Sequence, residues 1–371
     1  MTVFICLLVS IILAYFISKY NYRLGLYFIS FVFVAVMGFR NNITADYENY
    51  EILYNRIWTD YQLLGLSGML GIHFAGDLLE PGYVLLNLLV YWLTAGSYRF
   101  FLIVNAIIIV IPLFKFFSKY PKSFFYTVAL YLVVGTYFEG FNVMRQMMAA
   151  SIATLSFQYI KDRRFIKYLG VILVASLFHM TSLLLVPIYF LFVHINKNRF
   201  LFRIQYLIIG LILFTNTTFF SQYFIGLMYE GSYDYEAGIT SIALTNFLLP
   251  LSLLIFCESV KIVLPNYYRD SEFKRSVIPQ YLMDYSIIET GMYIWLILGA
   301  CTVQIPMITR FASLFSPFAM IYIAESLSGI KNSTSRVLIK LFFITILVLY
   351  QVLSLTSGSV YLNDYVFTLS F

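Results

Sequence analysis

Charged side chains are scarce in this sequence of 371 residues, where Asp, Glu, Lys and Arg together make up 11%. Apolar and aromatic residues make up 61%. A water-soluble domain of this size needs more polar surface than that, so the composition excludes a soluble monomer and predicts an integral membrane protein. Apolar runs of about 15 to 20 residues recur along the chain, and each is long enough to cross a hydrocarbon core of about 30 Å as a helix.

Cysteine and recognisable cofactor motifs are also scarce. The three cysteines, Cys6, Cys257 and Cys301, lie in or beside apolar runs, and no CxxC or Cys/His ligand spacing occurs. The sequence therefore predicts neither a disulfide framework nor a zinc site. It also has no paired-acid metal motif, glycine-rich phosphate loop or nucleotide fingerprint. These absences favour a protein without metal or cofactor.

The apolar runs predict an all-α, polytopic membrane protein with about ten transmembrane helices in a single membrane domain, residues 1–371. Two stretches fit poorly as single crossings: 80–95, which begins with Glu80-Pro81-Gly82, and 166–195, which is too long and has His179 in its middle. We expect 80–95 to be an interfacial or re-entrant helix, and 166–195 to be a hairpin of two part-helices. The predicted crossings are 3–18, 25–39, 98–114, 123–138, 145–160, 204–224, 241–257, 286–304, 308–326 and 337–355.

The distribution of basic residues orients this layout. Placing 19 of the 24 Lys and Arg residues in cytoplasmic segments satisfies the positive-inside rule and puts both termini outside. The net charge of +6 then needs no nucleic-acid partner, because the lysines lie beside anionic lipid of the inner leaflet. The five basic residues left on the outer side are all arginines: Arg40, Arg56, Arg99, Arg145 and Arg310.

Five short motifs follow one another along the chain. They are an arginine leading into a DY…Y segment (Arg40, Asp46, Tyr47, Tyr50), EPGY followed by LLN (80–87), N-x-x-R-Q-x-x-A (142–149), ASLFHMTSL (175–183) and TRF (309–311). This series resembles the EpsG branch of the Wzy polysaccharide polymerases over about residues 40–330. One departure is visible, because Thr44-Ala45 stands where that family usually has Gly-Thr before Asp-Tyr.

The resemblance implies an enzyme of the bacterial inner membrane that joins oligosaccharide repeats carried on undecaprenyl diphosphate. The growing glycan would pass from its lipid diphosphate to another lipid-linked repeat at the periplasmic face. A GT-C-like arrangement is one that the resemblance allows, and membrane lipid and a chain-length regulator protein are the partners that it suggests.

The outer arginines suit a diphosphate donor, since a guanidinium stays charged and matches phosphate oxygens with a planar fork. In the predicted layout Arg40 ends one crossing, and Arg145 and Arg310 each begin another near a helix N-terminus, where free amides favour an anion. We therefore expect these three to bind the diphosphate. For each one alone, an arginine that merely extends to the membrane surface is an equally good interpretation.

An acceptor hydroxyl also needs a base. His179 is a candidate because its ordinary pKa permits proton transfer near neutral pH, and Asp46 is the rival. A structural role for His179, in which the ring bonds a neighbouring carbonyl, stays open. Asp46 could equally pair with Arg40.

Residues expected to bind the glycan lie in the same motifs and in outer segments. They are Tyr47, Tyr50, Glu80, Glu139, Asn142 and Gln146. The long stretch 40–79 exceeds ordinary connection lengths, so we expect it to form an extracytoplasmic loop region that covers the site. The loop 229–238, rich in acids and tyrosines, is a further candidate for the sugar path.

Two other functions compete with the polymerase. A flippase for the same lipid-linked oligosaccharide would need similar arginines, but such transporters usually show repeated halves, and none is evident in this sequence. An O-antigen ligase would share the donor and hand the glycan to a different acceptor.

Overall fold

The protein is described here by a computed structural model, in which every regular element is helical across the described residues. These residues are 2–41, 44, 46–75, 79–193, 199–217, 219, 241–263, 280–305, 308–330 and 332–356. The loop 229–238 lies outside them, as does part of the predicted crossing 204–224. The all-α prediction is confirmed for this part of the chain.

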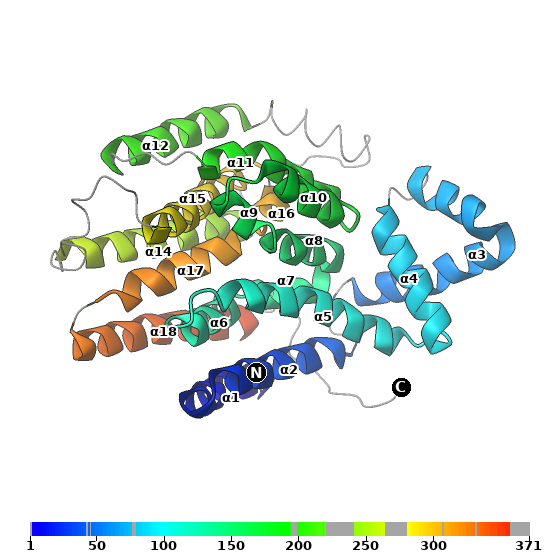
Figure 1. Cartoon of the computed structure of the whole chain (residues 1–371), viewed down its shortest axis with the longest axis horizontal. Helices are drawn as coiled ribbons and strands as arrows, with labels where there is room; N and C mark the ends of the chain where they lie inside the picture. The colour runs from blue at the N-terminus through cyan, green and yellow to red at the C-terminus, as the bar shows by residue number, and fades with distance from the viewer. Residues whose placement is uncertain are drawn as a thin grey trace. The chain divides into compact units, whose positions relative to one another are not determined.

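The helices belong to two compact units, and each unit is described separately. The first unit comprises residues 1–156, 170–182 and 342–371. Its complete helices are α1 (Thr2–Tyr20), α2 (Tyr22–Gly38), α3 (Tyr47–Ala75), α4 (Pro81–Thr94), α5 (Tyr98–Phe117), α6 (Phe124–Val133), α7 (Thr136–Asn142) and α8 (Met144–Thr154). Figure 1 shows α1, α2 and α5 running side by side, and α8 also packs against α5.

Within the first unit, α3 changes the interpretation of the stretch 40–79. The sequence predicts an extended loop region there, whereas the structure has a helix of 29 residues that bends at Gly65. Gly65 has φ 67° and ψ −178°, a conformation that essentially only glycine adopts. The two arms of α3 lie beside α4 (Figure 1), joined by a small apolar core of Ile57, Met69, Leu79 and Val84.

One predicted crossing and the predicted hairpin are both broken helices. The stretch 123–138 forms α6 and the start of α7, which bend by 57° at Gly135. The stretch 166–195 forms α10 (Phe165–Ser176), a 3-10 turn η1 (Met180–Leu184) and α11 (Leu185–Val193). His179 lies in the break between α10 and η1, as the predicted pair of part-helices requires.

The second unit comprises residues 157–169 and 183–341. Its core is formed by packing of α14 against α15, of α15 against α17 and of α14 against α17. Its complete helices are α9 (Phe157–Lys161), α11, α12 (Arg199–Thr215), α14 (Ser241–Val263), α15 (Gln280–Cys301), α16 (Thr309–Ala312) and α17 (Ser316–Ser328). Helices α10 and α18 (Ser333–Thr356) each begin in this unit and end in the first.

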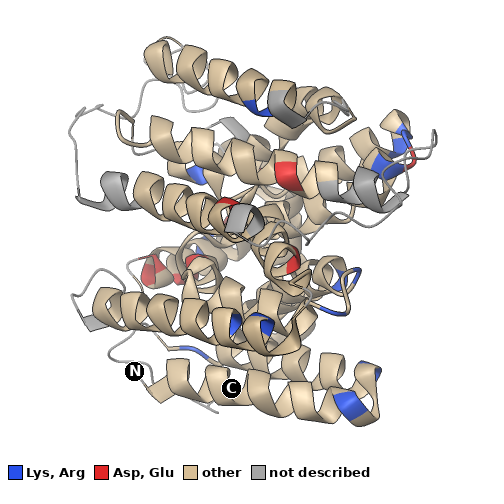
Figure 2. Ribbon diagram, turned by 90° about the vertical axis from the view of Figure 1, so that its left-hand side faces the viewer, with Lys and Arg blue, Asp and Glu red and all other residues tan. Residues whose placement is uncertain are grey.

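The described helices fit a membrane protein, and Figure 2 shows how few of their residues are charged. Three of them, α1, α5 and α18, are long and apolar enough to cross a membrane, or four if α6 and α7 form one broken span. Other apolar helices are shorter, because breaks such as the one between α8 and α9 divide the predicted runs. The membrane class is therefore supported, while the number of ten crossings stays a prediction.

Candidate active site

The EPGY motif brings α4 against the end of α10 in the first unit. Glu80 is the N-cap residue of α4, and Pro81 occupies the first helical position, where its missing N–H costs nothing. Gly82 lets the two segments touch, since a Cβ there would lie 2.7 Å from Leu177 Cβ and 2.8 Å from its carbonyl oxygen. The Tyr83 amide completes the junction by donating to that carbonyl at 3.1 Å.

His179 is held at this junction by its own chain segment. Its amide donates to the Ala175 carbonyl at the end of α10, and its carbonyl accepts from the amide and hydroxyl of Ser182 in η1. These bonds fix the backbone of His179 at the break between the two part-helices. The side chain is 7% exposed and points to Glu80.

Glu80 binds three donors at once. Its Oε1 lies 2.6 Å from His179 Nδ1 and accepts from the Met180 amide at 3.2 Å. Its Oε2 accepts from Arg145 NH1 at 2.8 Å. Although Glu80 is the N-cap residue, its side chain makes no capping bond to α4, so both carboxylate oxygens are available to these three donors. We call Glu80, His179, Met180 and Arg145 the Glu80 cluster.

The electrostatics of the cluster keep Glu80 ionised. Burial alone would raise the pKa of the Glu80 carboxyl, but the hydrogen bond with His179 and the positive charge of Arg145 outweigh burial and lower this pKa. Arginine and a backbone amide can only donate, so both oxygens of Glu80 act as acceptors. It follows that His179 Nδ1 carries the proton of the short Nδ1–Oε1 contact.

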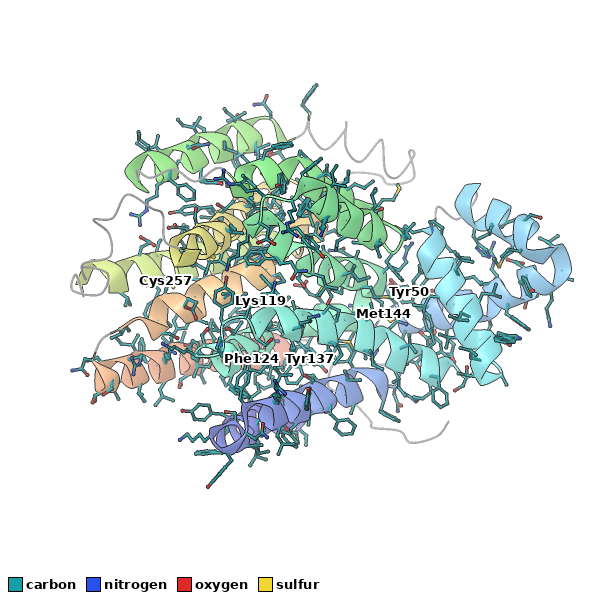
Figure 3. The ribbon with its side chains drawn as sticks, in the orientation of Figure 1. Tyr50, Lys119, Phe124, Tyr137, Met144 and Cys257 are labelled. Carbon is teal, nitrogen blue, oxygen red and sulfur yellow. The ribbon has the colours of Figure 1, made fainter. Side chains whose placement is uncertain are left out.

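Arg145 connects the cluster to a partly open surface. Its side chain is 26% exposed, and one guanidinium nitrogen bonds Glu80. The guanidinium carbon lies 5.8 Å from the centre of the Tyr83 ring, which packs edge-on against Tyr50. Figure 3 labels Tyr50, which belongs to α3. Burial raises the pKa of the Tyr50 hydroxyl, and the neighbouring charge of Arg145 opposes this rise. The remaining N–H groups of Arg145 suit an anionic oxygen from a ligand.

Arg40, which follows α2, also lies near the start of α8, but its side chain is enclosed by protein. Its guanidinium is fully buried and donates to the Met37 carbonyl at 2.8 Å and to the Phe141 carbonyl at 3.4 Å. It also contacts the sulfur of Met144, the residue before Arg145, at 2.9 Å. The structure thus brings two of the three predicted arginines to the start of α8, and in this conformation Arg40 bonds protein carbonyls.

The third predicted arginine and the rival base lie elsewhere. Arg310 begins α16 in the second unit, so its part in a diphosphate site stays a prediction. Asp46 lies in the turn before α3 and forms no ion pair with any described residue, Arg40 included. It lies close enough to raise the pKa of Tyr50 by its charge. This geometry connects His179, and not Asp46, to a charged partner.

The predicted glycan-binding residues fall into two groups. Asn142 ends α7, and its side-chain oxygen is buried without a hydrogen-bond partner in the described structure, so it could accept from a ligand hydroxyl. Tyr50 also lies beside Arg145. Tyr47, by contrast, packs its ring edge-on against Tyr98 at 5.4 Å and is buried. Glu139 lies in α7, and Gln146 is buried in α8.

Sequence reasoning underestimated two acids. It placed Glu80 only among the residues expected to bind the glycan, whereas Glu80 is 6% exposed and central to the cluster. The Pro81-Gly82 pair that follows Glu80 was the signal in the sequence. Proline marks the start of a helix, and glycine permits another backbone segment to lie close. Asp60 was missed altogether: its Oδ2 lies 3.2 Å from Nε2 of the fully buried His73, across the bend of α3.

The fold and the cluster define a class, an all-helical membrane protein with an acid, a histidine and an arginine joined at a helix junction. The sequence profile of the EpsG family matches residues 23–369, so the chain belongs to the EpsG family and the resemblance seen in its motifs is confirmed. Membership indicates a polysaccharide polymerase of the glycosyltransferase type, acting in polysaccharide biosynthesis at a membrane. No curated protein and no solved structure matches the chain.

Proposed function

We propose that the protein transfers a growing glycan from undecaprenyl diphosphate to a lipid-linked oligosaccharide repeat at the periplasmic face of a bacterial inner membrane. The observation that carries this proposal is the Glu80 cluster, which joins a histidine to a partly exposed arginine within the family's motifs. The outer location rests on the charge distribution of the sequence.

In this reaction the acceptor hydroxyl oxygen forms a bond to the anomeric carbon of the growing glycan. The bond from that carbon to the diphosphate oxygen breaks, and its electron pair leaves with undecaprenyl diphosphate. The hydroxyl proton passes to a base, for which His179 is our candidate and Asp46 the rival. Undecaprenyl diphosphate gains negative charge as it leaves, so a fixed cation beside it lowers the barrier.

Arg145 is the cation that we place at the diphosphate, because part of its side chain is exposed while Glu80 holds its position. A phosphate bound there would also lie at the N-terminus of α8, where amide N–H groups point outward. Arg310 is proposed as a further diphosphate ligand. Arg40, which bonds carbonyls of α2 and α7, is proposed to hold the start of α8 in place for Arg145.

Asn142, Tyr50 and the α3–α4 segment are proposed to bind the sugars next to the diphosphate. The unsatisfied oxygen of Asn142 can accept from a sugar hydroxyl, and the Tyr50 ring offers an apolar face to a pyranose. In this proposal the sugar lies beside Arg145, and the lipid diphosphate binds N–H groups of Arg145 that do not bond Glu80.

The direct test is surface-glycan length in the native strain with Arg145→Ala, His179→Gln or Arg310→Ala. We expect long chains to disappear while a single repeat still reaches the surface and protein abundance stays normal. Arg99→Ala is a suitable control, because Arg99 bonds the Arg40 carbonyl at the protein's own backbone.

Other outcomes of the same test distinguish the competing functions. Loss of even the single repeat would indicate a flippase. Free polymer accumulating on its lipid carrier would indicate a ligase. Long chains that survive all three substitutions would contradict the proposed site.

A further inference from the structure

We infer that Glu80 is a positioning residue that holds the His179 ring with its Nε2 free to take the acceptor proton and ties this base to the phosphate-binding Arg145. The inference rests on the proposed function and deepens it. It assigns Glu80, expected from the sequence to contact the glycan, a role through His179, and it selects His179 over Asp46 as the base.

The first argument is the occupancy of the Glu80 oxygens. Oε1 receives His179 Nδ1 and the Met180 amide, and Oε2 receives Arg145. With three donors in place and a side chain 6% exposed, Glu80 has little capacity left for a sugar hydroxyl. Its carboxylate is therefore committed to protein groups.

The second argument is the tautomer of His179. Because Glu80 accepts at both oxygens, the ring proton must sit on Nδ1, which leaves the lone pair on Nε2. Among the described residues no group bonds Nε2. A neutral imidazole held in this way is oriented for general base catalysis, since a carboxylate on one nitrogen raises the basicity of the other.

The third argument is the shared carboxylate. The charged groups that face His179 are Glu80, which precedes α4, and Arg145 of α8 behind the same carboxylate. The tyrosines Tyr50 of α3 and Tyr83 of α4 lie beside Arg145. Oε1 of Glu80 holds His179 while Oε2 holds Arg145. The candidate base and the candidate phosphate ligand are therefore positioned by the same side chain.

The test measures which ring nitrogen of His179 carries the proton, without requiring activity. The 15N chemical shifts of the two imidazole nitrogens distinguish the Nδ1–H tautomer from the Nε2–H tautomer. The full chain is labelled with 15N-histidine in lipid nanodiscs, and substitution of the two other histidines of the chain assigns the His179 signals. Wild type, Glu80→Gln and Glu80→Asp are compared. Glu258→Gln is the matched control, because Glu258 of α14 in the second unit also accepts from an arginine, Arg203.

In wild type we expect the proton on Nδ1 of His179, because Glu80 accepts there, and in Glu80→Gln we expect the population of this tautomer to fall. Glu80→Asp should restore part of it, and Glu258→Gln should leave it at the wild-type value. An unchanged tautomer in a folded Glu80→Gln protein, or a wild-type His179 with its proton on Nε2, would overturn the inference.

Turnover provides a second readout. In Glu80→Gln we expect kcat to fall with KM nearly unchanged. A substitution that only loosened the fold would lower abundance and leave kcat per folded molecule in place. If the His179 tautomer changes in Glu80→Gln while wild type polymerises no lipid-linked repeat, the proposed function fails and the positioning role stands.

Discussion

Two glutamates in this protein are bound in the same way and suit different tasks. In the first unit Glu80 accepts from Arg145 at one oxygen and contacts His179 at the other. In the second unit Glu258 of α14 accepts from Arg203 of α12 at one oxygen and from the Tyr322 hydroxyl of α17 at the other, at 2.5 Å. We call Glu258, Arg203 and Tyr322 the Glu258 cluster.

The difference lies in the third partner. Tyr322 bonds Glu258 through its hydroxyl, so the Glu258 cluster joins the three helices α12, α14 and α17. His179 has two ring nitrogens and bonds Glu80 through only one. The same acid–arginine pair therefore forms a structural link in one place and a candidate catalytic site in the other.

Substituting the arginine of each cluster should give the largest difference in transfer rate between the two clusters. Arg145→Ala is expected to lower the transfer rate about 100- to 1,000-fold, because it removes a donor from the charge that develops on the leaving diphosphate. Arg203→Ala should lower the melting temperature and preserve glycan length. The measurement is transfer from a labelled lipid-linked repeat, with thermal melting in parallel. Equal losses of transfer in both variants would remove the distinction.

Substitutions of His179 and of Tyr322 should differ almost as much in their effect on transfer. His179→Gln is expected to slow transfer about 100- to 10,000-fold, the usual range for loss of a general base. Tyr322→Phe should cost about 1 kcal/mol of stability through one lost hydrogen bond and leave transfer intact. Single-turnover kinetics and denaturant unfolding check the two effects. A fully active His179→Gln enzyme would return Asp46 to consideration as the base.

Two glycines that lie in close contact with another segment, one in each unit, can be compared in the same way. Gly82 touches Leu177 beside the Glu80 cluster, and Gly291 of α15 faces Phe318, where a Cβ would lie 2.3 Å from Phe318 Cβ. Either change to alanine is expected to cost about 1–3 kcal/mol through overpacking. Only Gly82→Ala should also lower transfer, by about 100-fold, because it moves α4 away from His179. Equal activity in both variants would show that the junction tolerates displacement.

The smallest effect is a pH dependence of stability. Glu80 has a lowered pKa in the folded protein, so its contribution is fully present above the pKa of an unfolded glutamate, about 4.3. It is lost as pH falls through the lower, folded value. The gap in melting temperature between wild type and Glu80→Gln should narrow as pH falls below about 4. A gap that widened as pH fell below about 4 would contradict an ionised Glu80.

Much of the local structure could be predicted from the sequence. The EPGY motif gave the start of α4, and the length of 166–195 together with His179 gave the break between α10 and η1. Both predictions rest on short-range chemistry, since proline and glycine restrict the backbone where they stand and a polar residue interrupts an apolar run. The resemblance to the EpsG family rested on the same motifs and is confirmed.

The helix in 40–79 and the burial of Arg40 could not be predicted from the order of residues. The stretch 40–79 has charges, three closely spaced glycines and no clean apolar period, so it resembled a loop, whereas packing on α4 stabilises it as a bent helix. Arg40 was expected to face a ligand because it follows an apolar run. Its burial depends on carbonyls of α7, and nothing near it in the sequence indicates that contact.

By itself the sequence determined the helical membrane class, the family and the short motifs, because composition and nearest-neighbour chemistry suffice for these. Only the tertiary structure decided which polar groups meet. Glu80 lies 65 residues from Arg145 and 99 from His179, and an apolar pattern shows which face of a helix is buried without showing which helix covers it. The packing of α4 against the end of α10, at a glycine without a Cβ, is what makes three scattered residues one cluster.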